Sequence, residues 1–205
     1  AGVYWYTEWL WFESVGYLSI FTTQLLSRFL LFLGVGVIAT LFLGGNLALA
    51  WRWLCRRGEV DSPIGRKWGL VLLWLVAAAF GLVMGLSAQS RWLDVLRFFQ
   101  ATPVGRVDPL FGRDVGYYLF QLPLLLNLKG ALLWLVIPTA VLTGLVYALG
   151  LRRRRAVPSW DVSGNTRPRS PLSLPWAHLS VVGALFLLVK AWDYQLQIQL
   201  LVYSQ

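Results

Sequence analysis

Charged residues are scarce in this sequence: Asp, Glu, Lys and Arg together make up only 13% of its 205 residues. A soluble domain usually carries about a quarter charged residues. Residues of the hydrophobic class reach 58%, and aromatic residues reach 15%. This composition argues against a water-soluble enzyme.

Residues that ligate metals or act as nucleophiles are also few. The single cysteine, Cys55, cannot form an internal disulfide or a cysteine metal cluster. The single histidine, His178, could ligate a pigment or haem iron, but no second ligand is evident, so we predict no cofactor. The Walker A, HExxH, CxxC, GxSxG and Rossmann glycine patterns are all missing from the sequence. We therefore predict no catalytic residue and no enzymatic activity for this chain.

Long apolar stretches decide the class of protein. Residues 29–51, 68–90 and 130–151 contain no charged residue, and about 20 apolar residues are enough for a helix to cross a bilayer. A fourth, less apolar span is predicted at 176–196, where a tryptophan near each end serves as an interfacial anchor. The sequence predicts an all-α fold, a polytopic transmembrane helical bundle with about four spans and interfacial amphipathic helices.

The stretches between the spans complete the predicted division of the chain. Trp92, Val95, Leu96 and Phe99 share one helical face with charged residues between them, which is typical of a helix in the membrane interface. The predicted segments are an aromatic interfacial segment (1–27), span 1 (28–54), a cytoplasmic loop (55–67), span 2 (68–90), an extracytoplasmic amphipathic segment (91–129), span 3 (130–151), a basic cytoplasmic loop (152–175), span 4 (176–196) and an extracytoplasmic tail (197–205).

The distribution of charge predicts the orientation. The net charge of +9 could suggest nucleic acid, but the loops 55–67 and 152–175, with the adjoining Arg52, carry most of the basic residues and few acids. By the positive-inside rule these loops are cytoplasmic and both termini are extracytoplasmic. The positive charge is thereby assigned to topology, and nucleic acid is excluded as a partner.

Small residues recur every four positions in three of the spans. The glycines among them that we predict to pack helices are Gly36, Gly44, Gly81, Gly85 and Gly144. Small side chains let helix backbones approach closely in lipid. The repeats fit packing of the spans on each other within one bundle, and they also fit assembly with other membrane subunits.

Two groups of charges at span ends are further candidate sites. Lys190 and Asp193 are one helical turn apart and are predicted to pair in the membrane, either as part of an ion path or as a snorkelling lysine neutralised by its aspartate. The run Arg152, Arg153, Arg154 and Arg155 either contacts anionic lipid headgroups or simply stops the third span at the cytoplasmic side.

Several motifs resemble those of the UPF0182 family of uncharacterised bacterial membrane proteins of cyanobacteria and actinobacteria. The motifs are WYTEWLWFESVGY (5–17), DPLFGRDVGYYLFQLP (108–123), HLS (178–180), KAW (190–192) and LLVYS (200–204). The resemblance implies that this chain is the N-terminal membrane part of a longer protein, with one span before it and an extracytoplasmic region after it. In the middle motif it is consistent with a turn at Asp108, close packing at Gly112 and Gly116, and a helix cap at Asp114.

The sequence therefore favours a non-catalytic scaffold or accessory subunit of a larger membrane complex, which would be photosynthetic if the source is cyanobacterial. The expected partners are the lipid bilayer, anionic lipid headgroups and other membrane subunits. The membrane would be the bacterial plasma membrane, or the thylakoid membrane in a cyanobacterium. A transporter element, or the membrane anchor of an extracytoplasmic enzyme domain beyond this chain, is the alternative.

Cysteine labelling tests the predicted orientation. A cysteine introduced at Asn165, in the basic loop, should react with a membrane-impermeant maleimide only after lysis, because this loop is predicted to be cytoplasmic. Reaction in intact cells would reverse the assigned orientation.

Overall fold

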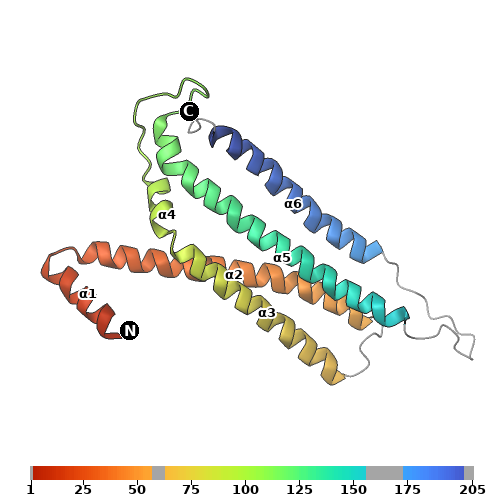
Figure 1. The fold of residues 1–205 in the computed structure, drawn as a ribbon. Coiled ribbons are helices and arrows are strands. Elements are labelled where there is room, and N and C mark those ends of the chain that lie inside the picture. The colour runs from red at the N-terminus through yellow and green to blue at the C-terminus, as the bar shows by residue number, and fades with distance from the viewer. Residues whose placement is uncertain (1, 57–62, 156–172, 201–205) are drawn as a thin grey trace, which may run out of the picture.

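The computed structural model describes residues 2–56, 63–155 and 173–200, which are mostly helical (Figure 1). The elements are α1 (Gly2–Ser14), α2 (Leu18–Arg56), α3 (Pro63–Gln89), α4 (Trp92–Phe99), the π-helical turn η1 (Tyr117–Gln121), α5 (Leu122–Arg155) and α6 (Ser173–Leu200). Within the described residues four helical stretches are long and apolar enough to cross a membrane: α2, α3, η1 with α5, and α6. The predicted all-α fold with four spans is confirmed.

The four long helices form two pairs. α2 packs along α3 and α5 packs along α6, and α2 also contacts α5 (Figure 1). The end of the bundle where α2 begins and α3 and α6 finish is called here the Asp193 end. The opposite end, where α5 finishes at Arg155, is called the basic end. The short helix α4 lies at the Asp193 end and contacts α2, η1 and α5.

The helix of the first span begins earlier than the predicted span. α2 has 39 residues, so it is about 58 Å long, against about 30 Å for the hydrocarbon of a bilayer. Its first turns, before Arg28, contain Ser19, Thr22 and Thr23, and both threonine hydroxyls donate back to the Ser19 carbonyl. Residues 18–27, which the sequence places in the aromatic interfacial segment, are thus part of the same continuous helix as the first span.

A glycine turn separates α1 from α2. Gly16 has a φ of +78°, a backbone conformation that favours glycine. The N–H of Gly16 donates to the Glu13 carbonyl at 3.1 Å and that of Tyr17 to the Phe12 carbonyl at 2.9 Å. This pair of bonds is the Schellman arrangement that ends a helix, so the chain reverses here and α2 starts afresh.

The helix of the third span also begins earlier than the predicted span. The sequence places residues 91–129 in an amphipathic segment before a span that begins at Gly130, whereas the structure has one helix from η1 through α5. Proline lacks an N–H, and in a regular α-helix its ring would clash with the carbonyl four residues earlier. The π turn immediately before Pro123 widens the backbone and relieves this conflict. The helix therefore continues instead of breaking.

Close contact between α2 and α3 is built from glycines. A Cβ atom on Gly81 would lie 2.5 Å from the Gly36 carbonyl oxygen, and one on Gly85 would lie 2.5 Å from the Phe32 carbonyl oxygen. A Cβ on Gly44 would meet the Trp74 ring at 2.6 Å. At Gly81 and Gly85 the obstacle is backbone, so only glycine permits the approach there, and Gly36 and Gly44 lie in the same contact between α2 and α3.

Gly144 on α5 is placed differently. A Cβ added there would have no atom of the described chain within 4 Å. Nearby Val141 and Leu145 on α5 are also exposed. Gly144 therefore does not serve close packing against another described helix.

Substitution of Gly81 and Gly144 should distinguish a glycine that packs against another helix from one that does not. Gly81→Leu should lower the free energy of unfolding by about 1 to 3 kcal/mol, because the new side chain forces α2 and α3 apart. Gly144→Leu should leave it unchanged, because its surroundings are open. Thermal unfolding of the purified protein in mild detergent measures both effects, and equal melting temperatures for the two variants would contradict the assignment of Gly81 to internal packing.

Candidate functional site

Asp193 is the most deeply buried charged group that the structure describes in the spans. Its exposed fraction is 3%, and its carboxylate accepts three hydrogen bonds. Lys129 donates to Oδ1 at 2.7 Å, Lys190 donates to Oδ2 at 2.6 Å, and the Gln197 amide donates to Oδ1 at 3.0 Å. We call these four residues the Asp193 cluster.

Two helices contribute to the cluster. Lys190, Asp193 and Gln197 follow one another at helical spacing on α6, so they share one face of that helix. Lys129 comes from α5 and is the only member from another helix. Its ammonium reaches across the interface between α5 and α6, so the cluster ties these two spans together.

One contact of this cluster could be predicted from the sequence and another could not. Lys190 is predicted to pair with Asp193, and their charged atoms are 2.6 Å apart. Lys129, which lies 64 residues before Asp193, is not among the predicted partners. The sequence does contain a signal for Lys129, namely its position. Lys129 bounds the charge-free stretch 130–151, just as Lys190 follows the apolar core of the fourth span.

The Asp193 carboxylate is fully paired within the cluster. One carboxylate is matched by two ammonium groups, and both carboxylate oxygens are already hydrogen-bonded. A buried charge that is paired and hydrogen-bonded is far less costly than an isolated one. The arrangement is suited to fastening helices and poorly suited to binding a cation, because two lysines already surround the only acid.

Polar contacts outside the cluster continue the fastening at the Asp193 end. The Tyr117 hydroxyl donates to the Gln199 side chain at 2.6 Å and links η1 to α6. The Asn127 amide donates to Asp94 at 3.0 Å and links α5 to α4. Every contact joins different helical elements, so they serve the same purpose as the Asp193 cluster.

The segment 103–116, called here the Asp108 loop, is held by two carboxylates. Asp108 accepts from the N–H groups of Leu110 and Phe111 and from the Tyr118 hydroxyl. Burial by itself raises the pKa of Asp108, but these hydrogen bonds outweigh it and hold the pKa below its usual value of 3.8. The interaction with Tyr118 ties the loop to the helix that follows.

Asp114 closes the same loop. Its carboxylate accepts from the N–H groups of Val104, Gly116 and Gly105 at 3.0, 2.6 and 2.8 Å. The backbone bonds, led by that from Val104, lower the pKa of Asp114 despite the opposing effect of burial. For both aspartates the stabilisation is therefore present above about pH 4 and is lost as the pH falls below it.

The glycines of this loop have two different roles. Gly112 has a φ of +65° and open space where a Cβ would be, so it is needed for a turn and not for the close packing that the sequence predicted. At Gly116 a Cβ would lie 2.9 Å from the Thr102 carbonyl oxygen, so close packing does apply there.

A second polar group lies toward the basic end, where α2, α5 and α6 meet. The Tyr147 hydroxyl is 2.9 Å from His178 Nδ1, and His178 Nε2 is 2.7 Å from Asn46 Oδ1. The Asn46 amide donates to the Phe42 carbonyl, so Asn46 Oδ1 is left to accept from His178. Both imidazole nitrogens are thereby used in hydrogen bonds between helices, which leaves neither free to ligate a metal.

Other predicted sites are not brought together with these. Among the described residues no group of three His, Cys, Asp or Glu side chains is arranged to hold a metal ion. The side chains of Arg152, Arg153, Arg154 and Arg155 lie outside what the structure describes, as do residues 57–62, 156–172 and 201–205 of the predicted loops and tail. Contact of the arginines with anionic headgroups stays a prediction.

Comparison with known proteins identifies the family. The model of the uncharacterised protein family UPF0182 matches residues 1–205. The chain belongs to the UPF0182 family. The UPF0182 protein of Cupriavidus necator is 36% identical over 96% of this chain and 22% of its own length, and that of Moorella thermoacetica is 33% identical over 96% and 22%. The UPF0182 protein of Salinispora tropica is 37% identical over 95% of this chain and 20% of its own length.

The UPF0182 relatives bear on the expected length of the whole protein and on the expected range of source bacteria. The chain spans about a fifth of the length of the relatives it matches. Cupriavidus and Moorella are neither cyanobacteria nor actinobacteria, so the family is distributed more widely than the resemblance implied. No solved structure matches this chain.

Replacement of each lysine tests the Asp193 cluster. Lys129→Met should lower the free energy of unfolding by about 1 to 2 kcal/mol, because it removes the charged hydrogen bond between α5 and α6. Lys190→Met should have a smaller effect, because Lys190 and Asp193 are on the same helix. The exposed Lys67, at the basic end, provides the control Lys67→Met. Thermal unfolding in detergent gives the ranking, and an effect of Lys129→Met no larger than that of Lys67→Met would contradict the proposed fastening.

Proposed function

We propose that this chain is a non-catalytic membrane scaffold, an accessory subunit that holds other membrane subunits in a larger complex. The observation that carries the proposal is the use of its buried and half-buried polar groups. Asp193, Tyr117 and His178 each make hydrogen bonds between helical elements of the same chain. These groups rigidify the bundle, which is what a scaffold requires.

The proposed surface for a partner helix is the outward face of α5. Gly144 offers room for close approach, and the exposed side chains of Val141 and Leu145 flank it. In lipid, helices associate through close contact at small residues and not through a hydrophobic driving force. The face therefore suits a transmembrane helix of another subunit.

The surrounding membrane supplies the other proposed partners. We place the chain in the bacterial plasma membrane, with both termini extracytoplasmic and the arginine run 152–155 against anionic headgroups of the cytoplasmic leaflet. A thylakoid location and a photosynthetic complex apply only to a cyanobacterial source. None of the three relatives described above comes from a cyanobacterium.

Two other functions are each favoured by one observation. The relatives are about five times longer than the matched region, which favours a membrane anchor for a domain that acts outside the membrane. The buried Asp193 favours a transporter element, because ionisable residues in spans commonly mark ion paths. The saturation of its carboxylate by two lysines argues against transport.

Assembly of the native protein tests the scaffold. After gentle solubilisation, the protein should migrate with a defined larger complex in native electrophoresis, and mass spectrometry should identify the other subunits. Gly144→Leu should weaken this association while leaving the amount of protein unchanged, because it fills the proposed contact face. Gly183→Leu on α6, where a Cβ also meets open space, is the matched control.

The competing functions predict different results. A monodisperse protein free of other subunits would overturn the scaffold proposal. Ion flux in liposomes that disappears in Asp193→Asn would establish a transporter element in its place, whereas we expect no such flux.

A further inference from the structure

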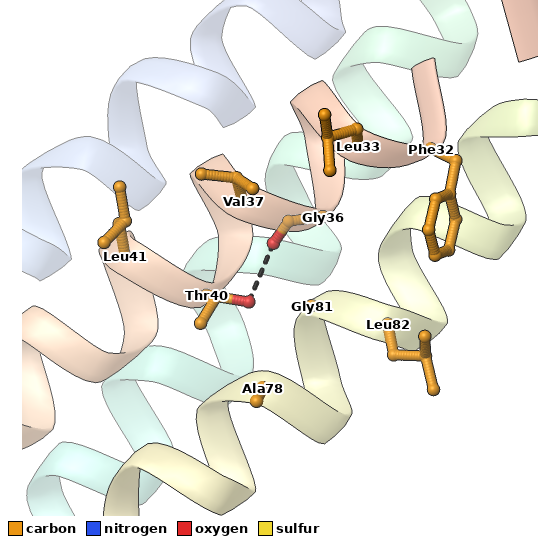
Figure 2. Close-up of a pocket in the computed structure, with 9 residues that line it drawn as sticks. All are labelled: Phe32, Leu33, Gly36, Val37, Thr40, Leu41, Ala78, Gly81 and Leu82. Carbon is orange, nitrogen blue, oxygen red and sulfur yellow. Dashed lines mark hydrogen bonds between the residues drawn. The ribbon is translucent and has the colours of Figure 1, made fainter. Parts of the chain in front are cut away.

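A groove runs along the outside of the contact between α2 and α3. Its floor is formed by Gly36, Thr40 and Gly81, and Figure 2 shows the Thr40 hydroxyl turned back to the Gly36 carbonyl oxygen, 2.8 Å away. Its walls are apolar and exposed, and they include Leu33, Val37, Leu41 and Leu82 (Figure 2). The groove encloses about 240 Å³. Its one hydroxyl already donates within the helix, so the groove favours a hydrocarbon occupant.

A second hollow of about 490 Å³ adjoins the groove toward the Asp193 end. Both are lined by Phe32, so they are neighbours along α2, and the groove and the second hollow are together called here the channel. The second hollow is lined by polar groups as well as apolar ones, namely Arg28, Gln89 and Ser90 together with Leu25, Phe29 and Phe32. An elongated apolar groove thus lies next to a cavity lined by a cation and an amide.

Arg28 is held in place without its charge being neutralised. Its guanidinium lies 5.4 Å from the centroid of the Trp92 ring, and the Gln24 side-chain oxygen, in the orientation that satisfies both groups, accepts from it at 2.9 Å. Both partners are neutral. Among the described residues no carboxylate lies within ion-pair distance of Arg28, so the cavity favours an anion.

The position of the channel relative to the membrane fits a lipid. Arg28 and Ser90 lie at the ends of the charge-free stretches 29–51 and 68–90, which is the level of the headgroups. From Phe32 to Leu41 the groove follows ten residues of helix, a length of about 14 Å at the usual rise per residue. One leaflet of the hydrocarbon is about 15 Å thick. The groove therefore has the length of an acyl chain within a single leaflet.

We propose that this channel binds one anionic phospholipid, with an acyl chain along the groove and the phosphate at Arg28. The Gln89 amide provides a second donor on the cavity wall. The anionic headgroup distinguishes the site from the apolar groove alone, because the groove has no charged lining residue and Arg28 supplies the selection for charge. This site lies on α2 and α3 and does not depend on the proposed partner face of α5.

Native mass spectrometry of the purified protein in nanodiscs tests the site. The probes are phosphatidylglycerol and phosphatidylcholine with identical acyl chains. The unmodified protein should retain one phosphatidylglycerol in preference to phosphatidylcholine. Arg28→Gln should weaken retention of phosphatidylglycerol about tenfold, the effect of losing one charge-assisted contact. Arg97→Gln, an exposed arginine of α4 outside the cavity, should have no effect.

A second pair of variants tests the groove separately from the charge. Ala78 lines the groove, and Ala79 is an exposed neighbour on α3 that does not. Ala78→Phe should fill the groove and release the lipid, whereas Ala79→Phe should not. Melting temperatures close to that of the unmodified protein show that each variant is folded.

Three outcomes would overturn the proposal. Equal retention of phosphatidylcholine and phosphatidylglycerol would mean that the groove accepts any bilayer lipid. Unchanged retention in both Arg28→Gln and Ala78→Phe would mean that the lipid binds elsewhere. Displacement of the lipid by millimolar inorganic phosphate would indicate a site for free phosphate.

Discussion

Helices in a bilayer gain little hydrophobic free energy by leaving lipid for one another, and this constraint accounts for the contacts that hold the bundle together. What remains is close van der Waals contact and hydrogen bonding between helices. The chain uses the first between α2 and α3, where Gly36 and Gly81 bring the two backbones together. It uses the second between α5 and α6, where Lys129 reaches Asp193.

The two helix pairs are joined toward the basic end. Asn46 on α2 contacts His178 on α6, which in turn contacts Tyr147 on α5. The Tyr147 ring also packs edge-on against Trp53, with 5.2 Å between the ring centroids. Polar fastening thus occurs toward both ends of the bundle, while apolar side chains such as Leu43, Leu47 and Ala77 fill the middle. A bundle fastened in this way resists separation of its pairs without a large apolar core.

The number and class of the helices could be predicted from the sequence because they depend on composition alone. Charge-free stretches bounded by Arg28, Lys129 and Arg152 mark where a chain can enter lipid. The helix ends could not be predicted as well, because helices extend beyond the hydrocarbon where no boundary acts on them. Pro123 is an example, since proline usually ends a helix, whereas here the helix continues through it after a π turn.

The contacts between distant residues were least accessible to sequence reasoning. Lys190 and Asp193 are close in the chain, and helical spacing alone brings them together. Lys129, Asn46 and Tyr147 meet their partners only because α2, α5 and α6 pack in one particular arrangement. The same holds for the glycines. Their spacing predicts that all of them pack helices, but only the structure shows that Gly81 faces a neighbouring helix and Gly144 does not.

The π turn at Tyr117–Gln121 fixes how the Asp108 loop is oriented relative to α6. A π turn inserts one residue into the helical register, which rotates everything before it by about 100° relative to the helix after it. Within this turn Tyr117 bonds to Gln199 on α6 and the neighbouring Tyr118 bonds to Asp108 in the loop. Both contacts depend on the number of residues in the turn. Deletion of one residue here would restore regular helical hydrogen bonding but would turn the Asp108 loop away from α6. The π turn therefore determines the angle between the loop and α6, in addition to joining the loop to α5.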